Sequence, residues 1–193
     1  MRAYHSLDDA DPFLPASAAL AAATRKALNA PGHHPVETFY ESLDMLRFPR
    51  AQIEDEIVAL LASKFEASID AVVTIGPAAL DFAEKHRGRL WPDARIFFQI
   101  VPDEVLRQAQ LSPTTTGIPV KYNFAGTVEI ALALRPATRR LIVVYGSGDY
   151  DRRVGAIARE QLQPFASRLP VEYWTDATIA ATMIFIPKLL NTA

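Results

Sequence analysis

Hydrophobic and polar positions along this chain follow two periods, one typical of buried strands and one typical of amphipathic helices. Short runs rich in β-branched and aromatic residues predict strands at residues 2–4, 36–41, 71–75, 95–101, 141–145 and 171–174. Several of these runs are continuously apolar rather than alternating, as in Leu141-Ile142-Val143-Val144. Continuous runs are typical of strands in parallel sheets, which helices cover on both faces.

Helical patterns separate the predicted strands. The first lies in an alanine-rich segment at 16–28, and the second has one apolar stripe at steps of three and four residues, made of Ile53, Ile57, Leu60, Leu61 and Phe65. Later helices are predicted at 77–85, with Pro77 in the first helical position, at 128–134, and from 151 to 169. This alternation predicts a doubly wound α/β fold with parallel sheets and right-handed crossovers.

The chain is expected to form two lobes. Residues 102–119 are rich in turn-forming residues, above all in Ser112-Pro113-Thr114-Thr115-Thr116-Gly117, so we predict an N-terminal lobe at 1–110 and a C-terminal lobe at 111–193. A helix interrupted by Pro187 is predicted at 177–191, and no strand pattern follows it. The second lobe is therefore expected to be incomplete.

The amino-acid composition argues against several functional classes. The 193 residues are 50% hydrophobic and carry a net charge of −2, which gives no electrostatic reason to bind nucleic acid or an anionic membrane. The chain contains no cysteine and four histidines, so we expect no metal site, no cofactor and no thiol nucleophile. Its apolar stretches are far shorter than the roughly 20 residues that span a bilayer, and no signal peptide pattern precedes the first strand.

Small and polar residues follow the predicted strands. In open α/β sheets, ligands bind beyond the carboxyl ends of the strands, where loops and helix N-termini converge. The residues in these places are His5 and Ser6, then Glu41, Ser42 and Asp44, then Gly76 and Pro77, then Gln99, and finally Gly146, Ser147 and Asp149. Such side chains suit a hydrogen-bonding pocket for a small molecule.

Several of these residues also have simpler interpretations. Gly76 and Pro77 could form no more than a turn from strand to helix. The loop at 146–149 lacks the lysine and the glycine spacing of nucleotide-binding loops, and Asp149 or Asp151 is expected to cap the following helix.

Catalytic interpretations have weaker support. His5 beside Ser6 suggests a hydrolase, but the chain has no GxSxG elbow. Glu41 and Asp44 could act as general acid and base, although such residues at strand ends more often cap helices or bind ligands. The acidic cluster of Asp8, Asp9 and Asp11 could hold a metal, and a solvated loop is the favoured interpretation.

A family resemblance runs through the same segments. It rests on the order and spacing of Tyr4-His5-Ser6, Phe39-Tyr40-Glu41-Ser42-Leu43-Asp44, Ile69-Asp70-Ala71-Val72-Val73, Gly76-Pro77-Ala78-Ala79-Leu80-Asp81-Phe82, Leu90-Trp91-Pro92, Thr116-Gly117, Gly126-Thr127 and 139–146. Together, over about 3–176, these segments resemble the extracytoplasmic sensor domains of bacterial sensor histidine kinases. Those domains are related to ABC transporter substrate-binding proteins of the tryptophan-binding type, with a type I periplasmic-binding-protein fold.

The resemblance implies a two-lobed clamp that closes on a small molecule in the periplasm. It implies a non-enzymatic sensor domain of a two-component signalling kinase, attached to the membrane only through other parts of a parent protein. The implied ligand-binding positions are Ser6, Glu41, Gly76, Gln99, Ser147 and Asp176. An aspartate usual in the family is replaced in the stretch Tyr122-Asn123-Phe124.

Three hypotheses remain open at this stage. The favoured one is a ligand-binding module, either a sensor domain or an ABC transporter solute-binding protein. The second is a doubly wound hydrolase or transferase, supported by His5 and Ser6, by Glu41 and Asp44, and by the 146–149 loop. The third is an interaction domain that forms a homodimer through an unfinished sheet edge.

Overall fold

The computed structural model describes residues 2–11, 15–31, 36–45, 48, 50–65 and 69–175. The helix predicted at 177–191 and the predicted site residue Asp176 lie outside these residues. The chain divides into two compact units, unit 1 at Met1–Lys121 and unit 2 at Tyr122–Ala193, and we describe each by itself. Among the described residues, no helix combines the length and the apolar character needed to cross a bilayer.

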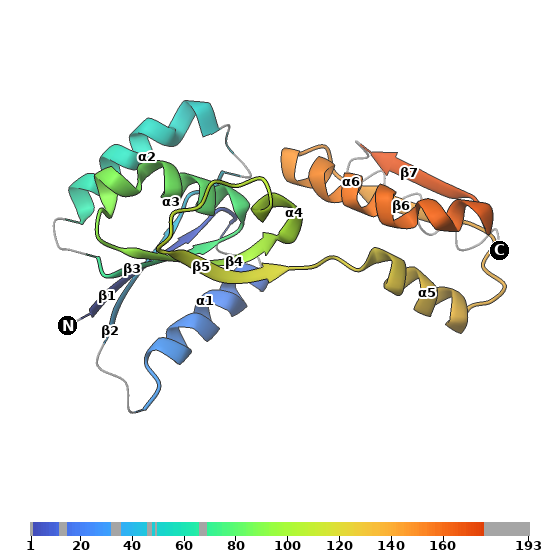
Figure 1. Cartoon of the computed structure of the whole chain (residues 1–193), viewed down its shortest axis with the longest axis horizontal. Coiled ribbons are helices and arrows are strands. Elements are labelled where there is room, and N and C mark those ends of the chain that lie inside the picture. Colours follow the sequence, from blue (N-terminus) through green and yellow to red (C-terminus); the bar gives the residue numbers. More distant parts are fainter. Residues whose placement is uncertain are drawn as a thin grey trace. The chain divides into compact units, whose positions relative to one another are not determined.

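Unit 1 is built on a five-stranded parallel sheet with the order β2-β1-β3-β4-β5. The strands are β1 (Arg2–Asp8), β2 (Val36–Ser42), β3 (Ala71–Ile75), β4 (Arg95–Pro102) and β5 (Thr115–Val120). Helices α2 (Arg50–Lys64) and α3 (Pro77–Leu90) cover one face, and α1 (Pro15–Leu28) lies on the other, as Figure 1 shows. A further short helix, α4 (Asp103–Leu106), follows β4. The predicted doubly wound parallel α/β fold is confirmed.

The main core lies between the sheet and helices α2 and α3. Apolar residues of β1, β3 and β4 supply it, because these strands are covered on this face. Its fully buried members include Leu7, Val72, Ile96 and Phe82, with Trp91 only 2% exposed at the end of α3. Burial of this apolar surface fixes the positions of the strands, and therefore of their carboxyl ends.

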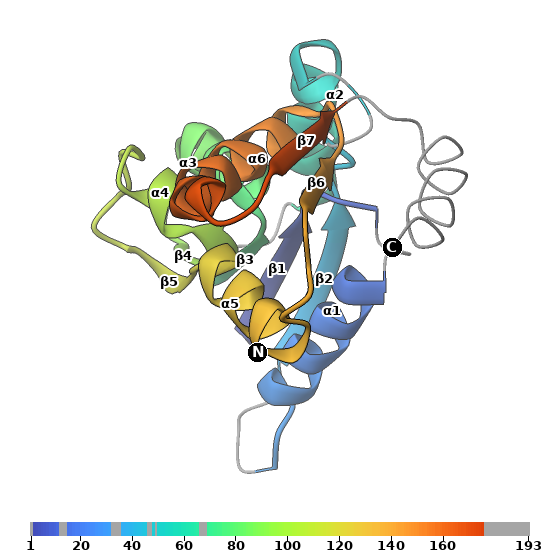
Figure 2. The same ribbon diagram turned by 90° about the vertical axis from the view of Figure 1, so that its right-hand side faces the viewer.

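Unit 2 is smaller. It contains α5 (Phe124–Leu134), β6 (Leu141–Tyr145), α6 (Asp149–Leu162), the 3-10 helix η1 (Gln163–Ser167) and β7 (Val171–Thr175). The strands β6 and β7 pair in parallel, and α6 lies along them in Figures 1 and 2. Apolar residues of α5, α6 and η1 form a separate small core, with Val128, Ala158, Leu162 and Phe165 among its buried members.

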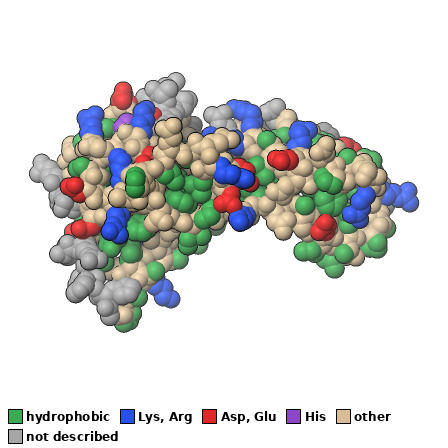
Figure 3. All heavy atoms as spheres, viewed as in Figure 1, with side chains coloured by type: hydrophobic (Ala, Val, Ile, Leu, Met, Phe, Trp, Pro, Cys, Tyr) green, Lys and Arg blue, Asp and Glu red, His purple; other side chains and the backbone are tan. Residues whose placement is uncertain are grey.

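The described residues leave apolar surface uncovered in both units. On unit 1, Ile118 of the edge strand β5 is 77% exposed, and on unit 2, Ile130 and Leu134 of α5 are 65% and 75% exposed. Figure 3 shows hydrophobic side chains at the surface of both units. Single exposed apolar residues are normal in proteins. Two of them on one short helix give α5 an apolar face that the described residues do not cover.

Several boundaries differ from the predictions. β1 runs to Asp8 rather than ending at residue 4, and β5 and α4 occupy the segment predicted as an irregular break. β5 hydrogen-bonds to β4, so the division between units falls at 121/122 instead of 110/111. β5 carries Gly117 and Pro119, which sequence patterns assign to turns; an edge strand tolerates both because one side of it needs no partner.

The last helix of unit 2 also differs. α6 begins at Asp149 rather than near Asp151, and the α-helix ends at Leu162, with η1 in place of its predicted continuation to 169. Pro164 lies in η1, and proline cannot donate the backbone hydrogen bond that an α-helix requires. Gly148 is the N-cap, and Asp151 acts as a capping residue because its carboxylate accepts the Gly148 backbone N–H at 3.2 Å.

Candidate ligand-binding site

The strand register brings one row of residues to the carboxyl end of the unit 1 sheet. Asp8 lies opposite Ser42 of β2 and Ile75 of β3, and Ile75 lies opposite Gln99 of β4. Directly opposed residues in a sheet point to the same face, so these side chains share the α1 face. This row, from Ser42 to Gln99, is the strand-tip row of unit 1.

Asp8 is the central member of the strand-tip row. Its side chain is fully buried, and its carboxylate accepts hydrogen bonds from the Tyr40 hydroxyl at 2.9 Å and from the Ala10 backbone N–H at 3.0 Å. Burial and the hydrogen bond to Asp8 raise the pKa of Tyr40. Tyr40 therefore stays a neutral phenol that donates to the carboxylate.

Asp9 points to the opposite face and reaches the N-terminus of α3. Its carboxylate accepts the Ala78 backbone N–H at 2.9 Å, and its backbone N–H donates to the Ile75 carbonyl at 3.1 Å. Burial raises the pKa of Asp9 from 3.8 to about 6, against the lowering effect of the backbone hydrogen bonds. The positive end of the α3 dipole is thus occupied by a carboxylate of the chain itself.

Gly76 connects β3 to α3 in a backbone conformation that favours glycine. Its φ is +91°, and its N–H donates to the Gln99 carbonyl at 3.0 Å. A Cβ placed on Gly76 would lie 2.2 Å from an oxygen of Asp9. The prediction that Pro77 opens the next helix is confirmed. The close approach of Asp9 gives Gly76 a local structural role whether or not a ligand binds here.

Gln99 and Ser6 share the α1 face, and each has a buried polar atom without a hydrogen-bond partner in the described part of the chain. Gln99 belongs to the strand-tip row. Ser6 lies one step deeper, opposite Tyr40 and Val73, because β1 is longer than predicted. The space between Ser6 and α1 measures only about 20 Å³, room for at most one water molecule.

Glu41 and His5 point to the α2 side of the sheet. Glu41 forms a salt bridge with Lys64, the last residue of α2. His5 is fully buried against the rings of Phe65 and Trp91, with centroid distances of 4.4 and 5.5 Å. Burial, together with the charge of Lys64, lowers the pKa of His5 to about 3, so the ring stays neutral at physiological pH. The predicted residues Ser6 and Glu41 are therefore on opposite faces of the sheet.

The acidic cluster differs from the sequence interpretation. Asp8 and Asp9 were expected in a solvated loop, but they are 0% and 5% exposed, so that expectation is wrong for both. No group of three or more metal-ligating side chains occurs among the described residues. Leu7 is the only apolar residue among positions 5–9, so the sequence gives little sign that β1 continues to Asp8.

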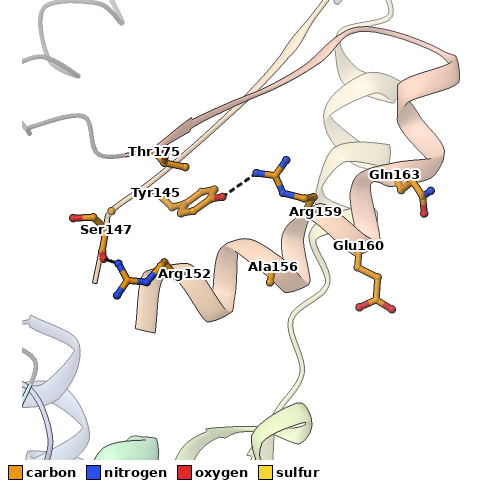
Figure 4. Close-up of a pocket in the computed structure, with 9 residues that line it drawn as sticks. Tyr145, Ser147, Arg152, Ala156, Arg159, Glu160, Gln163 and Thr175 are labelled. Carbon is orange, nitrogen blue, oxygen red and sulfur yellow. Dashed lines mark hydrogen bonds between the residues drawn. The ribbon is translucent and has the colours of Figure 1, made fainter. Parts of the chain in front are cut away.

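Unit 2 has its own hollow at the carboxyl end of β6. Ser147 lines it, together with Tyr145, Gly146, Arg152, Arg159 and Thr175, and its volume is about 760 Å³. Arg159 donates to the Tyr145 hydroxyl at 3.2 Å, and its guanidinium carbon lies 3.9 Å from the centre of the Tyr173 ring. Arg152 donates to the Ser147 carbonyl. Figure 4 shows both guanidinium groups directed between α6 and the strand ends.

Comparisons with known proteins found solved structures that are similar to this chain in fold. No family model matches the sequence, and no curated protein matches it. A ligand-free, open substrate-binding protein with adhesive properties from Clostridium difficile is similar over 98% of this chain and 62% of its own, with 14% identity and a TM-score of 0.61. An ABC domain in complex with L-Trp from Streptococcus pneumonia is similar over 89% and 56%, with 14% identity and a TM-score of 0.56.

A conserved domain protein from Vibrio cholerae is similar over 90% of this chain and 57% of its own, with 18% identity and a TM-score of 0.61. The chain thus spans 56–62% of the length of these three proteins. Identities this low show a shared fold and leave the ligand of this chain to be argued from its own residues. The fold of this chain is the parallel α/β fold of the periplasmic-binding-protein kind.

Proposed function

We propose that this chain binds a small molecule and does not catalyse a reaction. The observation that carries the proposal is the strand-tip row of unit 1, where Gln99 has a buried carboxamide oxygen without a hydrogen-bond partner among the described residues. A buried acceptor without a donor costs about 1–3 kcal/mol, and a ligand N–H or O–H would remove that cost. Gly76 and Ser147, at the strand tips of the two units, are further proposed contacts.

The geometry gives little support to an enzyme. His5 and Ser6 are neighbours in a strand, so their side chains point to opposite faces of the sheet and cannot exchange a proton directly. Glu41 is held by Lys64. The combination of His5 and Ser6 suggested by the sequence therefore loses its geometric basis, and Glu41 has a structural partner in Lys64.

For the biological role, we favour the sensor domain of a periplasmic histidine kinase, on the family resemblance of the sequence. An ABC transporter solute-binding protein is the second candidate, because the similar structures include a substrate-binding protein and an ABC domain. The gene context separates the two. A kinase in the same reading frame supports the sensor, and an adjacent permease and ATPase support the transporter.

A thermal-shift screen tests binding itself. The compounds are the proteinogenic amino acids, with L-tryptophan included because one similar structure contains it, small organic acids and purines. A ligand at 100 times its Kd stabilises the native state by about 2.7 kcal/mol, which gives a clear rise in Tm. A screen in which no compound raises the Tm contradicts the proposal.

Replacing the carboxamide of Gln99 tests the site. We expect Gln99→Leu to weaken any hit at least tenfold, because the ligand donor loses its acceptor. The matched control is Gln108→Leu, the same change at an exposed position after α4, which should leave the affinity unchanged. Equal affinities of wild type and Gln99→Leu would place the ligand elsewhere.

A further inference from the structure

Arg159 is a guanidinium group held in place by neutral partners. It contacts the Tyr145 hydroxyl and the face of the Tyr173 ring, and it makes no ion pair within the part of the chain that the structure describes. Glu160 also lines the hollow, and Figure 4 shows its side chain extending away from Tyr145 and Thr175. The Arg159 guanidinium is thus fixed in direction by neutral groups, while the carboxylate of Asp151 caps α6 beside Gly146 and accepts the Gly148 backbone N–H.

The hollow is large enough for a small organic molecule. Its volume of about 760 Å³ lies within the range of about 300–1,000 Å³ typical of ligand pockets. Tyr145 supplies an aromatic wall, and the backbone of Gly146 and Ser147 lies at the rim. Arg152 lies two helical turns before Arg159 on the same side of α6, so a second guanidinium flanks the same space.

A cation held between a hydroxyl and an aromatic face is preorganised, because little side-chain freedom remains to be lost on binding. Guanidinium groups prefer oxyanions, which accept two parallel N–H bonds. We propose that the unit 2 hollow binds the oxyanion group, a carboxylate or a phosphate, of a small organic ligand, with Arg159 as its principal contact. This inference rests on the proposed function, since Ser147 belongs to both.

A structural role for Arg159 is the competing interpretation. An exposed arginine that stacks on a tyrosine covers apolar surface even when no ligand binds. The two interpretations differ in one measurable respect. A purely structural Arg159 would affect thermal stability without affecting the response of the protein to anions.

Three probes with one aromatic body test the charge preference of the hollow. These are benzoate, phenyl phosphate and benzylamine, titrated at constant ionic strength and followed by the NMR chemical shifts of the whole chain. We expect benzoate or phenyl phosphate to saturate with shifts centred on 145–147 and 159, and benzylamine to give no saturation. The tighter of the two oxyanions identifies the preferred group.

Paired variants test the residue. Arg159→Gln should weaken oxyanion binding at least tenfold, and Arg153→Gln, which removes the same charge from an exposed position of α6 outside the hollow, should change it less than twofold. Tyr145→Phe, which removes the hydroxyl that positions Arg159, should weaken it severalfold. Equal losses from the two arginine variants would indicate nonspecific attraction and overturn the proposal, as would equal binding of benzylamine.

The outcomes also separate this inference from the proposed function. A screening hit whose affinity is unchanged by Arg159→Gln leaves small-molecule binding in place and overturns the oxyanion site. If neither oxyanion saturates and the screen is silent, both proposals fail together. Oxyanion binding that depends on Arg159, in a protein with no hit from the screen, supports the hollow and counts against the residues of the unit 1 site.

Discussion

The carboxyl ends of the strands in the two units differ in charge and in burial. In unit 1, the carboxylates of Asp8 and Asp9 are buried and already accept hydrogen bonds from the chain itself. In unit 2, Arg152 and Arg159 are exposed and border an open hollow. The same parallel topology therefore produces a buried acidic tip in unit 1 and, in unit 2, a hollow that is lined by two exposed arginines together with Glu160.

This difference indicates that the two strand tips suit different chemical groups. The N-terminus of α3 would attract an anion, but Asp9 already occupies it. Taken by itself, the unit 1 tip is proposed to accept a neutral hydrogen-bond donor through Gln99, and the unit 2 hollow is proposed to bind an oxyanion through Arg159. The following substitutions test this contrast, beginning with the one that has the largest expected effect.

Gly76→Ala should destabilise unit 1 by about 3 kcal/mol. Alanine disfavours the φ of +91°, and its Cβ would lie 2.2 Å from the Asp9 carboxylate. Chemical denaturation measures the loss. Gly88→Ala is the control, since a Cβ there meets nothing within 4 Å and alanine should stabilise α3 by about 0.5–1 kcal/mol. Partial rescue of Gly76→Ala by Asp9→Ala would identify Asp9 as the source of the clash.

Asp9→Asn should stabilise the protein at pH 7.5 by about 3 kcal/mol, because each unit of the pKa shift corresponds to about 1.4 kcal/mol. The folded pKa of about 6 exceeds the unfolded value of 3.8, so the stability that Asp9 contributes is complete below 3.8 and is lost as the pH rises through 6. The gain from asparagine should therefore vanish near pH 4. Urea titrations at both pH values test this, and a gain that is the same at both would show that the charge of Asp9 is irrelevant.

His5 gives the opposite pH dependence. Its folded pKa of about 3 lies below the unfolded value of 6.5, so the unfolded chain gains a proton first and stability falls as the pH drops below 6.5. Between pH 7.5 and 5.5 we expect a loss of about 1.4 kcal/mol in wild type relative to His5→Leu. Comparing the two chains cancels the contribution of Asp9. Parallel stability curves would mean that His5 is protonated in the core or accessible to solvent.

Arg159→Gln should change the free energy of unfolding by less than about 1 kcal/mol, since an exposed cation–π contact contributes little. A small effect on stability would separate binding from folding, because the same variant is expected to weaken oxyanion binding at least tenfold. Thermal denaturation of the variant without ligand provides the measurement. A loss comparable to that of Gly76→Ala would show that Arg159 is part of the framework of unit 2.

Much of the fold could be predicted from the sequence. The apolar runs at 71–75 and 141–145 were assigned to strands with correct bounds, because each is short, continuous and bounded by turn residues or helix starts. β5 was missed because its only apolar members are Ile118 and Val120 among threonine, glycine and proline. Pairing with β4 makes it a strand, and local composition does not contain that information.

The candidate site was predicted less completely, for a related reason. Ser147 and Gln99 were placed at strand ends, and the register agrees with that placement for Gln99 beside Ile75. The end of β1 was placed too early, so Ser6 was expected where Asp8 and Asp9 lie. A polar side chain in a strand gives no local sign of whether it is buried.

The sequence by itself determined the order of strands and helices, and with it a parallel sheet whose carboxyl ends meet at one edge, because period and turn chemistry are local properties of the chain. Only the tertiary structure decided which polar groups satisfy each other there and which remain available. The pairing of Tyr40 with Asp8, of Lys64 with Glu41, and of Asp9 with α3 depends on register and burial between segments far apart in sequence. Among the described residues, Gln99 keeps an oxygen without a hydrogen-bond partner and Arg159 makes no ion pair, which is why we propose these two as ligand contacts.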